Sequence, residues 1–173
     1  MEKPLVGILM GSDSDLGVMA EAAKVLEEFG VAYEITVLSA HRTPDRAHEY
    51  AHGAASKGIK VIIAGAGGAA HLAGVMAANT TLPVIGIPVN SSAFKGLDSL
   101  LATVQMPPGI PVGTVGVDSG KNAGLLAVQI LATADEKLTH KLVDYKKKMA
   151  DSVNEKAKKL EDMGYKDYLS QAK

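Results

Sequence analysis

The sequence predicts a three-layer α/β protein built on an open parallel sheet. Short runs of β-type residues alternate with helical stretches along most of the chain. These runs are almost continuously apolar, which is typical of parallel strands that helices cover on both faces. Glycine, hydroxyl and charged side chains gather after the strands, whereas ordinary turn residues lead from each helix into the next strand. Together the three observations favour a flavodoxin-like or Rossmann-like sheet.

Five strands and five helices should alternate in this sheet. The strands are expected over residues 5–10, 33–38, 61–64, 84–88 and 112–117. The helices are expected over about 15–29, 44–57, 68–79, 96–106 and 121–133. Gly30, Gly58 and Gly109 lie where helices should end, since glycine readily adopts the left-handed conformation found there.

A long helical tail follows the alternating part. From Asp135 the chain is rich in lysine and glutamate, and apolar residues recur at helical spacing. They are Leu138, Leu142, Tyr145, Met149, Val153, Leu160 and Met163. This face could fold back on its own domain, but no strand remains for it to cover, so contact with another subunit is favoured. We expect a single domain over 1–173, with a core of about 4–133 and a tail of about 135–173 for subunit contacts.

Composition excludes several classes of protein. The 173 residues are 47% hydrophobic and 21% charged, which fits a folded domain with a full core. A net charge of −1, 4% aromatic residues and no tryptophan argue against a nucleic-acid partner. The lack of cysteine excludes disulfides, thiolate catalysis and cysteine-ligated zinc. No run approaches the roughly 18 apolar residues of a membrane span and no secretory signal is evident, so a cytoplasmic location without a membrane partner is expected.

The most informative segment is Ser39-Ala40-His41-Arg42-Thr43-Pro44, between an expected strand and an expected helix. An imidazole such as that of His41 accepts and donates protons near neutral pH. Arg42 keeps its charge, and its fork of donors suits a phosphate or a carboxylate. Thr43-Pro44 directs the chain into the helix. Taken alone, a surface turn would remain the simpler interpretation.

A second loop, Gly11-Ser12-Asp13-Ser14-Asp15, follows the first expected strand. Its backbone N–H groups and the hydroxyls of Ser12 and Ser14 could bind an anion at the helix start. The carboxylates would repel a phosphate at close range, so one is expected to cap the helix and another to accept hydrogen bonds from sugar hydroxyls. Capping alone is an equal alternative. No Gly-Lys-Ser/Thr follows, which excludes a Walker loop.

A third loop, Gly65-Ala66-Gly67-Gly68-Ala69-Ala70, has the spacing of a dinucleotide-binding fingerprint. That fingerprint also needs an acidic residue about 20 positions later, and residues 85–90 contain none. NAD is therefore not the favoured ligand, and what remains is a backbone that can approach a ligand closely. His71 could line the same site or be a structural histidine. Residues 90–96 form a fourth loop at this edge.

His48-Glu49-Tyr50-Ala51-His52 has the H-E-x-x-H pattern of zinc proteases. The expected buried face of this helix places both histidines on its polar flank. That face consists of Ala47, Ala51, Ala54 and Ala55. No obvious third ligand accompanies the pair. We therefore interpret them as two surface histidines one turn apart and expect no metal.

Several motifs occur in a fixed order along the chain. They are Met10-Gly11-Ser12-x-Ser14-Asp15, Ser39-Ala40-His41-Arg42-Thr43-Pro44, Ala64-Gly65-Ala66-Gly67-Gly68-Ala69-Ala70-His71-Leu72, Gly96-Leu97-Asp98-Ser99-Leu100, Val104-Gln105-Met106-Pro107 and Asn122-Ala123-Gly124-Leu125-Leu126. In this order they resemble the PurE family of purine biosynthesis, over about residues 5–132. The resemblance departs at Ala73, where the family usually has proline, and the loss of that restraint puts the rigidity of the loop in question.

The resemblance implies a class I enzyme, an N5-carboxyaminoimidazole ribonucleotide mutase, that moves a carboxyl group from an exocyclic nitrogen to ring carbon C4. No ATP, metal, biotin or other cofactor is implied, and the expected assembly is a homo-octamer with sites at subunit boundaries. His41 would be the general acid and base. Arg42 and Ser12 would hold the 5′-phosphate or carboxylate, Asp15 the ribose, and Ser39 with Gly67-Gly68-Ala69 the migrating CO2. The implied substrate-binding set is Ser12, Asp15, Arg42, Ser14, Ser39, Gly67, Gly68, Ala69, His71 and Leu72.

Two alternatives to the mutase stay open on the sequence. The first is a carboxylase that adds free CO2 to aminoimidazole ribonucleotide. The second is a non-catalytic, flavodoxin-like module that binds a nucleotide. Retention of a flavin or another nucleotide, without isomerisation of the carboxylated ribonucleotide, would indicate the second.

Overall fold

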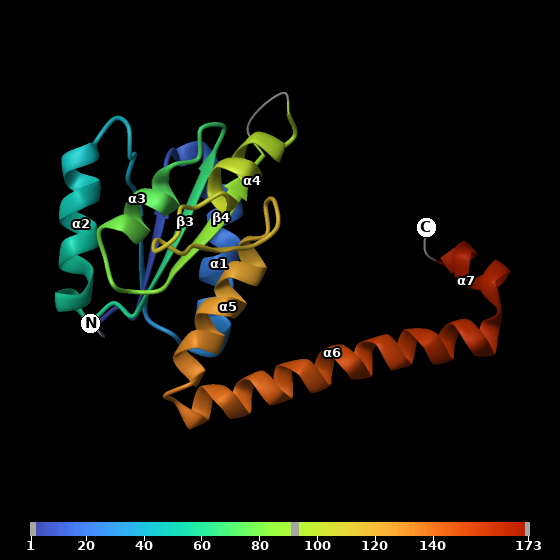
Figure 1. Ribbon diagram of the computed structural model, residues 1–173. Helices are drawn as coiled ribbons and strands as arrows, with labels where there is room; N and C mark the ends of the chain where they lie inside the picture. Colours follow the sequence, from blue (N-terminus) through green and yellow to red (C-terminus); the bar gives the residue numbers. More distant parts are fainter. Residues whose placement is uncertain (1–2, 91–93, 172–173) are drawn as a thin grey trace.

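The computed structural model describes residues 3–90 and 94–171 and contains a five-stranded, fully parallel sheet (Figure 1). The strands, in the spatial order β2-β1-β3-β4-β5, are β1 Val6–Met10, β2 Tyr33–Val37, β3 Val61–Gly67, β4 Val84–Val89 and β5 Gly113–Thr114. The helices are α1 Leu16–Phe29, α2 Pro44–Lys57, α3 Leu72–Ala78, α4 Leu97–Val104, α5 Gly120–Ala132, α6 Glu136–Met163 and α7 Tyr165–Gln171, and a short 3-10 helix, η1, spans Asp13–Asp15. The predicted parallel α/β fold is confirmed.

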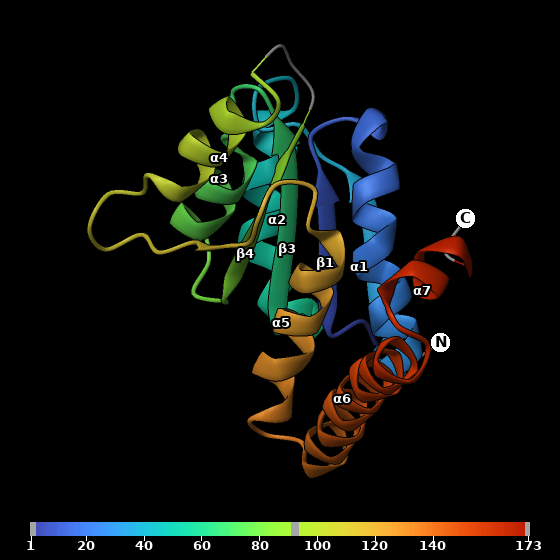
Figure 2. The same ribbon diagram turned by 90° about the vertical axis from the view of Figure 1, so that its right-hand side faces the viewer.

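Two hydrophobic clusters cover the two faces of the sheet. On one face Ile8 and Ile63 pack with α1 and α5, and on the other Leu9 and Ile62 pack with α2 and α3. Figure 2 shows α3 and α4 on the side of the sheet opposite α1. The close packing of α1 and α5 depends on Gly124, because a Cβ there would lie 2.8 Å from the carbonyl oxygen of Ala22.

The strand order places three loops at one edge of the sheet. After β1 the chain first adds β2 on one side and then β3 on the other, so β1 lies between them. This reversal is the topological switch point at which open α/β sheets bind ligands. Gly11 N donates to Gly65 O at 3.0 Å and Leu38 N donates to Met10 O at 2.8 Å, so the three strand ends remain hydrogen-bonded up to the loops.

Some predicted boundaries are wrong, and each has a local cause. β3 continues to Gly67 because Ala66 and Gly67 pair with Pro88 and Val89 of β4. The chain then turns at Gly68, with φ of 59°, and α3 begins only at Leu72 rather than at 68. β5 has two residues instead of six, although Val115 N still donates to Gly86 O. Ala55 of α2 is exposed, whereas the rest of its predicted buried face is buried.

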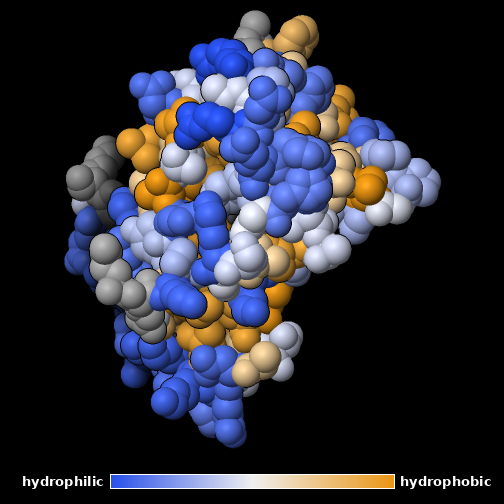
Figure 3. All heavy atoms as spheres, turned by 90° about the vertical axis from the view of Figure 1, so that its left-hand side faces the viewer, coloured by the Kyte–Doolittle hydropathy of each residue, from blue (hydrophilic) through white to orange (hydrophobic). Residues whose placement is uncertain are grey.

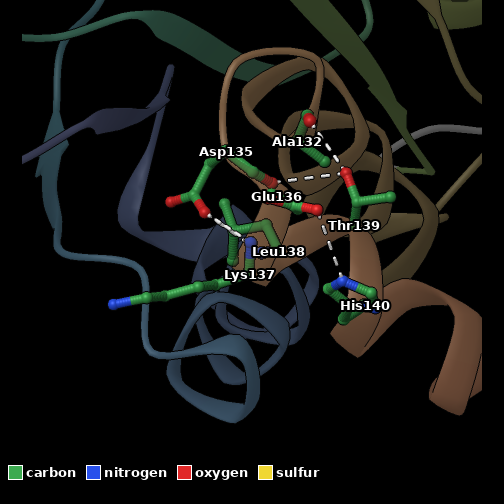
Figure 4. A network of polar contacts seen from close by, with 7 residues as sticks. All are labelled: Ala132, Asp135, Glu136, Lys137, Leu138, Thr139 and His140. Carbon is green, nitrogen blue, oxygen red and sulfur yellow. Dashed lines mark hydrogen bonds and ion pairs between the residues drawn. The ribbon is translucent and has the colours of Figure 1, made fainter.

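The start of α6 is anchored to the domain. Asp135 caps the helix by accepting hydrogen bonds from the backbone N–H groups of Lys137 (2.9 Å) and Leu138 (3.2 Å), as Figure 4 shows. Lys141 Nζ donates to Phe29 O at the end of α1 (2.6 Å), and the Phe29 and Tyr145 rings lie 5.7 Å apart. Beyond this point α6 projects away from the sheet (Figures 1 and 2).

The projecting part of α6 carries exposed apolar side chains. They include Met149, Val153 and Leu160. The tail therefore does not fold back on its own sheet along its length, and this apolar face has no cover within the described chain. In the part of the chain that the structure describes, no helix is long and apolar enough to cross a membrane.

Candidate active site

A cavity of about 300 Å³ lies at the carboxyl ends of β1, β2 and β3. It is lined by Gly11, Ser12, Ser14, Asp15, Ser39, Ala40, His41, Arg42, Ala66, Gly67, Ala69, His71 and Leu72. Every predicted site residue lines it except Gly68, whose φ of 59° turns the chain between the lining residues Gly67 and Ala69. Gly11, Ala40 and Ala66 were not among the predicted residues. Glycine has no side chain and alanine a small one, so these positions leave room for a ligand. The glycine and alanine residues of the motifs could have indicated this from the sequence.

Arg42 ties the loop after β2 to the loop after β1. Its Nη2 donates to Gly11 O at 2.7 Å, and its Nε and backbone N donate to Ser39 Oγ at 3.3 and 3.2 Å. Thr43 closes the same turn, since its Oγ1 donates to Ser39 O and accepts from Ser39 N. Within the described residues, ion pairs form only between Lys24 and Glu21 and between His140 and Glu136. The Arg42 charge thus faces the cavity without a neutralising carboxylate in direct contact.

His41 and His71 form a hydrogen-bonded pair across the cavity. His41 Nε2 lies 2.8 Å from His71 Nδ1, and the rings meet edge to face with centroids 4.9 Å apart. Only one of the two facing nitrogens carries the hydrogen in this arrangement, so the tautomers of the two rings are coupled and His71 restrains the direction of the His41 ring. The sequence left the role of His71 open, and the structure brings it to the group predicted to transfer protons.

Asp15 is a buried carboxyl group in the lining of the cavity, with 4% of its surface exposed. Burial raises its pKa above the ordinary aspartate value, and the hydrogen bond from Ser14 Oγ at 3.2 Å opposes that shift. Neither carboxylate of this loop caps a helix: Ser12 Oγ accepts from Ser14 N at the start of η1, and Asp15 precedes α1 without a side-chain cap. The prediction of a capping aspartate is therefore wrong, which leaves Asp15 available to a ligand.

Asp15→Asn should stabilise the unliganded protein at neutral pH. The unfolded chain ionises at the ordinary aspartate pKa, while burial holds the folded pKa higher. As pH rises between these two values the wild type loses stability relative to the variant, and below both values the difference disappears because Asp15 is then neutral in both states. Urea unfolding at several pH values from about 3 to 8 measures this. The prediction would be contradicted if the wild type became more stable relative to Asp15→Asn as the pH rises.

His48 and His52 lie one turn apart on α2. Both are exposed on α2, with ring centroids 4.2 Å apart, as the sequence predicted. Among the described residues, no group of three or more His, Cys, Asp or Glu side chains could hold a metal ion. Of the fourth loop, residues 91–93 lie outside the described residues. Asn90 N donates to Asp118 Oδ1 at 2.8 Å.

Comparison with known proteins identifies the family. A family model described as AIR carboxylase matches residues 5–152. The chain belongs to the AIR carboxylase family. A relative from Pyrococcus horikoshii, named N5-carboxyaminoimidazole ribonucleotide mutase, is 64% identical over 98% of this chain and 96% of its own length. A Schizosaccharomyces pombe protein named phosphoribosylaminoimidazole carboxylase is 56% identical over 97% of this chain, but the match covers 30% of that protein.

The AIR carboxylase fold is also seen in a solved relative. The crystal structure of Treponema denticola PurE has a TM-score of 0.83 and 33% identity, over 91% of this chain and 98% of that one. This result confirms the resemblance to PurE proteins that the ordered loops predicted. In this AIR carboxylase family member, Ala73 is buried in the first turn of α3.

Proposed function

We propose that this chain is an N5-carboxyaminoimidazole ribonucleotide mutase of purine biosynthesis. The observation that carries the proposal is that three loops meet in one cavity around the imidazole of His41, which is hydrogen-bonded to His71 and lies beside Arg42. The relative that matches nearly full length at 64% identity bears the name of this activity. The enzyme is accordingly an isomerase that takes a small phosphorylated ribonucleotide.

His41 can perform both proton transfers of the reaction. The substrate is a carbamate: a proton from His41 to its nitrogen breaks the C–N bond and releases CO2 and the free amine. The amine makes C4 an enamine-like nucleophile that attacks the retained CO2 and forms the new C–C bond. Neutral His41 then removes the C4 proton, which restores the aromatic ring and the starting protonation state. His71, at 2.8 Å, holds the His41 ring in place for both steps.

The remaining cavity residues hold the substrate and keep CO2 from escaping. We assign Ser12 and Arg42 to the phosphate or carboxylate, and Asp15 to the ribose hydroxyls, for which a buried carboxyl group is a good partner. Ser14 supports Asp15 through its hydroxyl. Ser39, Gly67, Ala69 and Leu72 would enclose the CO2 position, and Gly68 would shape that loop through its positive φ.

A carboxylase that uses free CO2 is the second candidate. The name of the Schizosaccharomyces pombe relative favours it, since the chain aligns with part of that protein. The test is a coupled assay with N5-carboxyaminoimidazole ribonucleotide, without ATP or added bicarbonate. Product formation under these conditions is expected of the mutase. Turnover that requires aminoimidazole ribonucleotide and bicarbonate, and that ignores the N5-carboxylated substrate, would establish the carboxylase instead.

We further propose that the uncovered apolar face of α6 contacts other subunits of a homo-octamer. Support comes from the exposed Val153, 63% accessible, and Leu160 on a helix that projects from its own sheet. We place the enzyme in the cytoplasm, where phosphorylated intermediates that do not cross membranes are made and consumed.

Val153→Glu should break or weaken this assembly. The expected wild-type mass by light scattering is eight times the 17.9 kDa of one chain, and the variant should elute at a smaller mass. Because residue 153 is exposed, helix content by circular dichroism should stay unchanged. Asn154→Glu, which adds the same charge at the next position, is the control. A monomeric wild type would refute the octamer.

A further inference from the structure

A second cavity adjoins the candidate active site at the start of α2. It has a volume of about 340 Å³ and is lined by Ser12, Asp13, Val37, Ser39, Arg42, Thr43 and Arg46. Ser12, Ser39 and Arg42 also line the first cavity, so the two cavities share a wall. Figure 3 shows the face that carries α2, with strongly hydrophilic residues gathered at the top, the edge at which the strands end.

The arginines of this chain are concentrated in that cavity. The sequence has 18 lysine and arginine residues, of which Arg42 and Arg46 are the only arginines, and both line the second cavity. Arginine differs from lysine in its planar fork of donors, which matches the oxygens of a phosphate in pairs. All other residues in that count are lysines. Both side chains that can bind a phosphate through paired donors therefore line the second cavity.

The two arginines are not used in the same way by the protein itself. Arg42 already donates to Gly11 O and Ser39 Oγ. Arg46 takes part in no hydrogen bond or ion pair with residues 3–90 or 94–171, so its donors remain available. Both cations also lie near the start of α2, where the helix dipole disfavours positive charge. This placement becomes favourable when an anion lies between them.

The charge of the cavity selects the kind of anion. Two guanidinium groups face one carboxylate, that of Asp13, whose Oδ1 accepts a hydrogen bond from Ser12 Oγ at 3.2 Å. The net charge is positive, and a phosphate monoester carries nearly two negative charges at neutral pH. Asp13 repels any anion, so binding depends on the two guanidinium groups, which attract a doubly charged phosphate more strongly than a singly charged group.

We propose that Arg46 is a second phosphate-binding residue, and that the phosphate end of the ribonucleotide lies at the shared wall between Arg42 and Arg46. The proposal rests on the proposed function, and it extends the substrate site into the second cavity. Arg46 lines only the second cavity and His41 only the first, so we expect Arg46 to contact no reacting atom. It is therefore a positioning residue that affects substrate affinity and leaves the chemical step unchanged.

The test is the steady-state kinetics of Arg46→Gln, with Arg46→Lys and Lys60→Gln beside it. Loss of one charge-assisted contact should raise KM about tenfold at unchanged kcat, and Arg46→Lys should recover part of the loss. Lys60 is exposed outside both cavities, so Lys60→Gln removes the same charge and should leave KM within about twofold. An unchanged KM in Arg46→Gln, an equal rise in Lys60→Gln, or a fall in kcat alone would overturn the proposal.

Titration with inorganic phosphate, followed by ³¹P NMR, separates this inference from the mutase assignment. Arg46→Gln should bind phosphate about tenfold more weakly than the wild type and Lys60→Gln. If that loss is found and the N5-carboxylated substrate is not turned over, the proposed reaction fails while the phosphate role of Arg46 stands. Equal phosphate affinity in all three proteins would overturn the role of Arg46 even in an active mutase.

Discussion

Replacement of His41 with asparagine should lower kcat by about 10²- to 10⁴-fold, the range that a positioned general acid–base group contributes. Asparagine keeps a polar group of similar size but transfers no proton. KM should change little, because the phosphate and ribose contacts are assigned to Ser12, Asp15 and Arg42. Steady-state kinetics with the N5-carboxylated ribonucleotide measures both constants.

Two other histidine variants sharpen this prediction. His48→Asn, at an exposed position of α2 outside the cavity, should be as active as the wild type. His71→Asn removes the ring that holds His41 at 2.8 Å, so kcat should fall less than in His41→Asn and its pH profile should change. Near-normal activity in His41→Asn would rule out the proton-transfer role.

Arg42→Met should raise KM by about 100-fold, which corresponds to the loss of one or two charge-assisted hydrogen bonds to the substrate. The same change removes the donors to Gly11 O and Ser39 Oγ that join two loops. The melting temperature should therefore fall by several degrees, since each lost hydrogen bond costs about 1 kcal/mol.

Arg42→Lys separates the two contributions of this residue. Lysine keeps the charge but not the fork of donors, so KM should lie between those of the wild type and Arg42→Met. Circular dichroism establishes that both variants are folded before kinetics are compared. A folded Arg42→Met with the wild-type KM would show that the substrate does not reach this side chain.

Local rules predicted the ends of α2 correctly but not those of α3. Pro44 occupies the first turn of α2 and Gly58 ends it with φ of 103°, and both signals are visible in the sequence. The start of α3 was predicted four residues too early, because pairing of Ala66 and Gly67 with β4 extends β3. Such pairing depends on a neighbouring strand, which no local pattern reveals.

The candidate site was predicted as a set of residues but not as a set of contacts. The expected parallel sheet already implied that loops following its strands share an edge. The pairing of His41 with His71, 30 residues apart, depends on β1 lying between β2 and β3 and on side-chain rotamers. The hydrogen bond from Arg42 to Gly11 O has the same origin. The proposed role of Arg46 could not be read from its motif, because it depends on a cavity that two separate segments, residues 12–13 and 37–46, form together.

The most direct test of the account follows a labelled carboxyl group. N5-carboxyaminoimidazole ribonucleotide with ¹³C in its carboxylate would be converted in buffer that contains unlabelled bicarbonate, and the C4-carboxylate of the product analysed by mass spectrometry. A mutase that keeps CO2 in the cavity beside His41 should carry the label into nearly all of the product. Product that takes its carboxylate from the unlabelled pool would contradict the account.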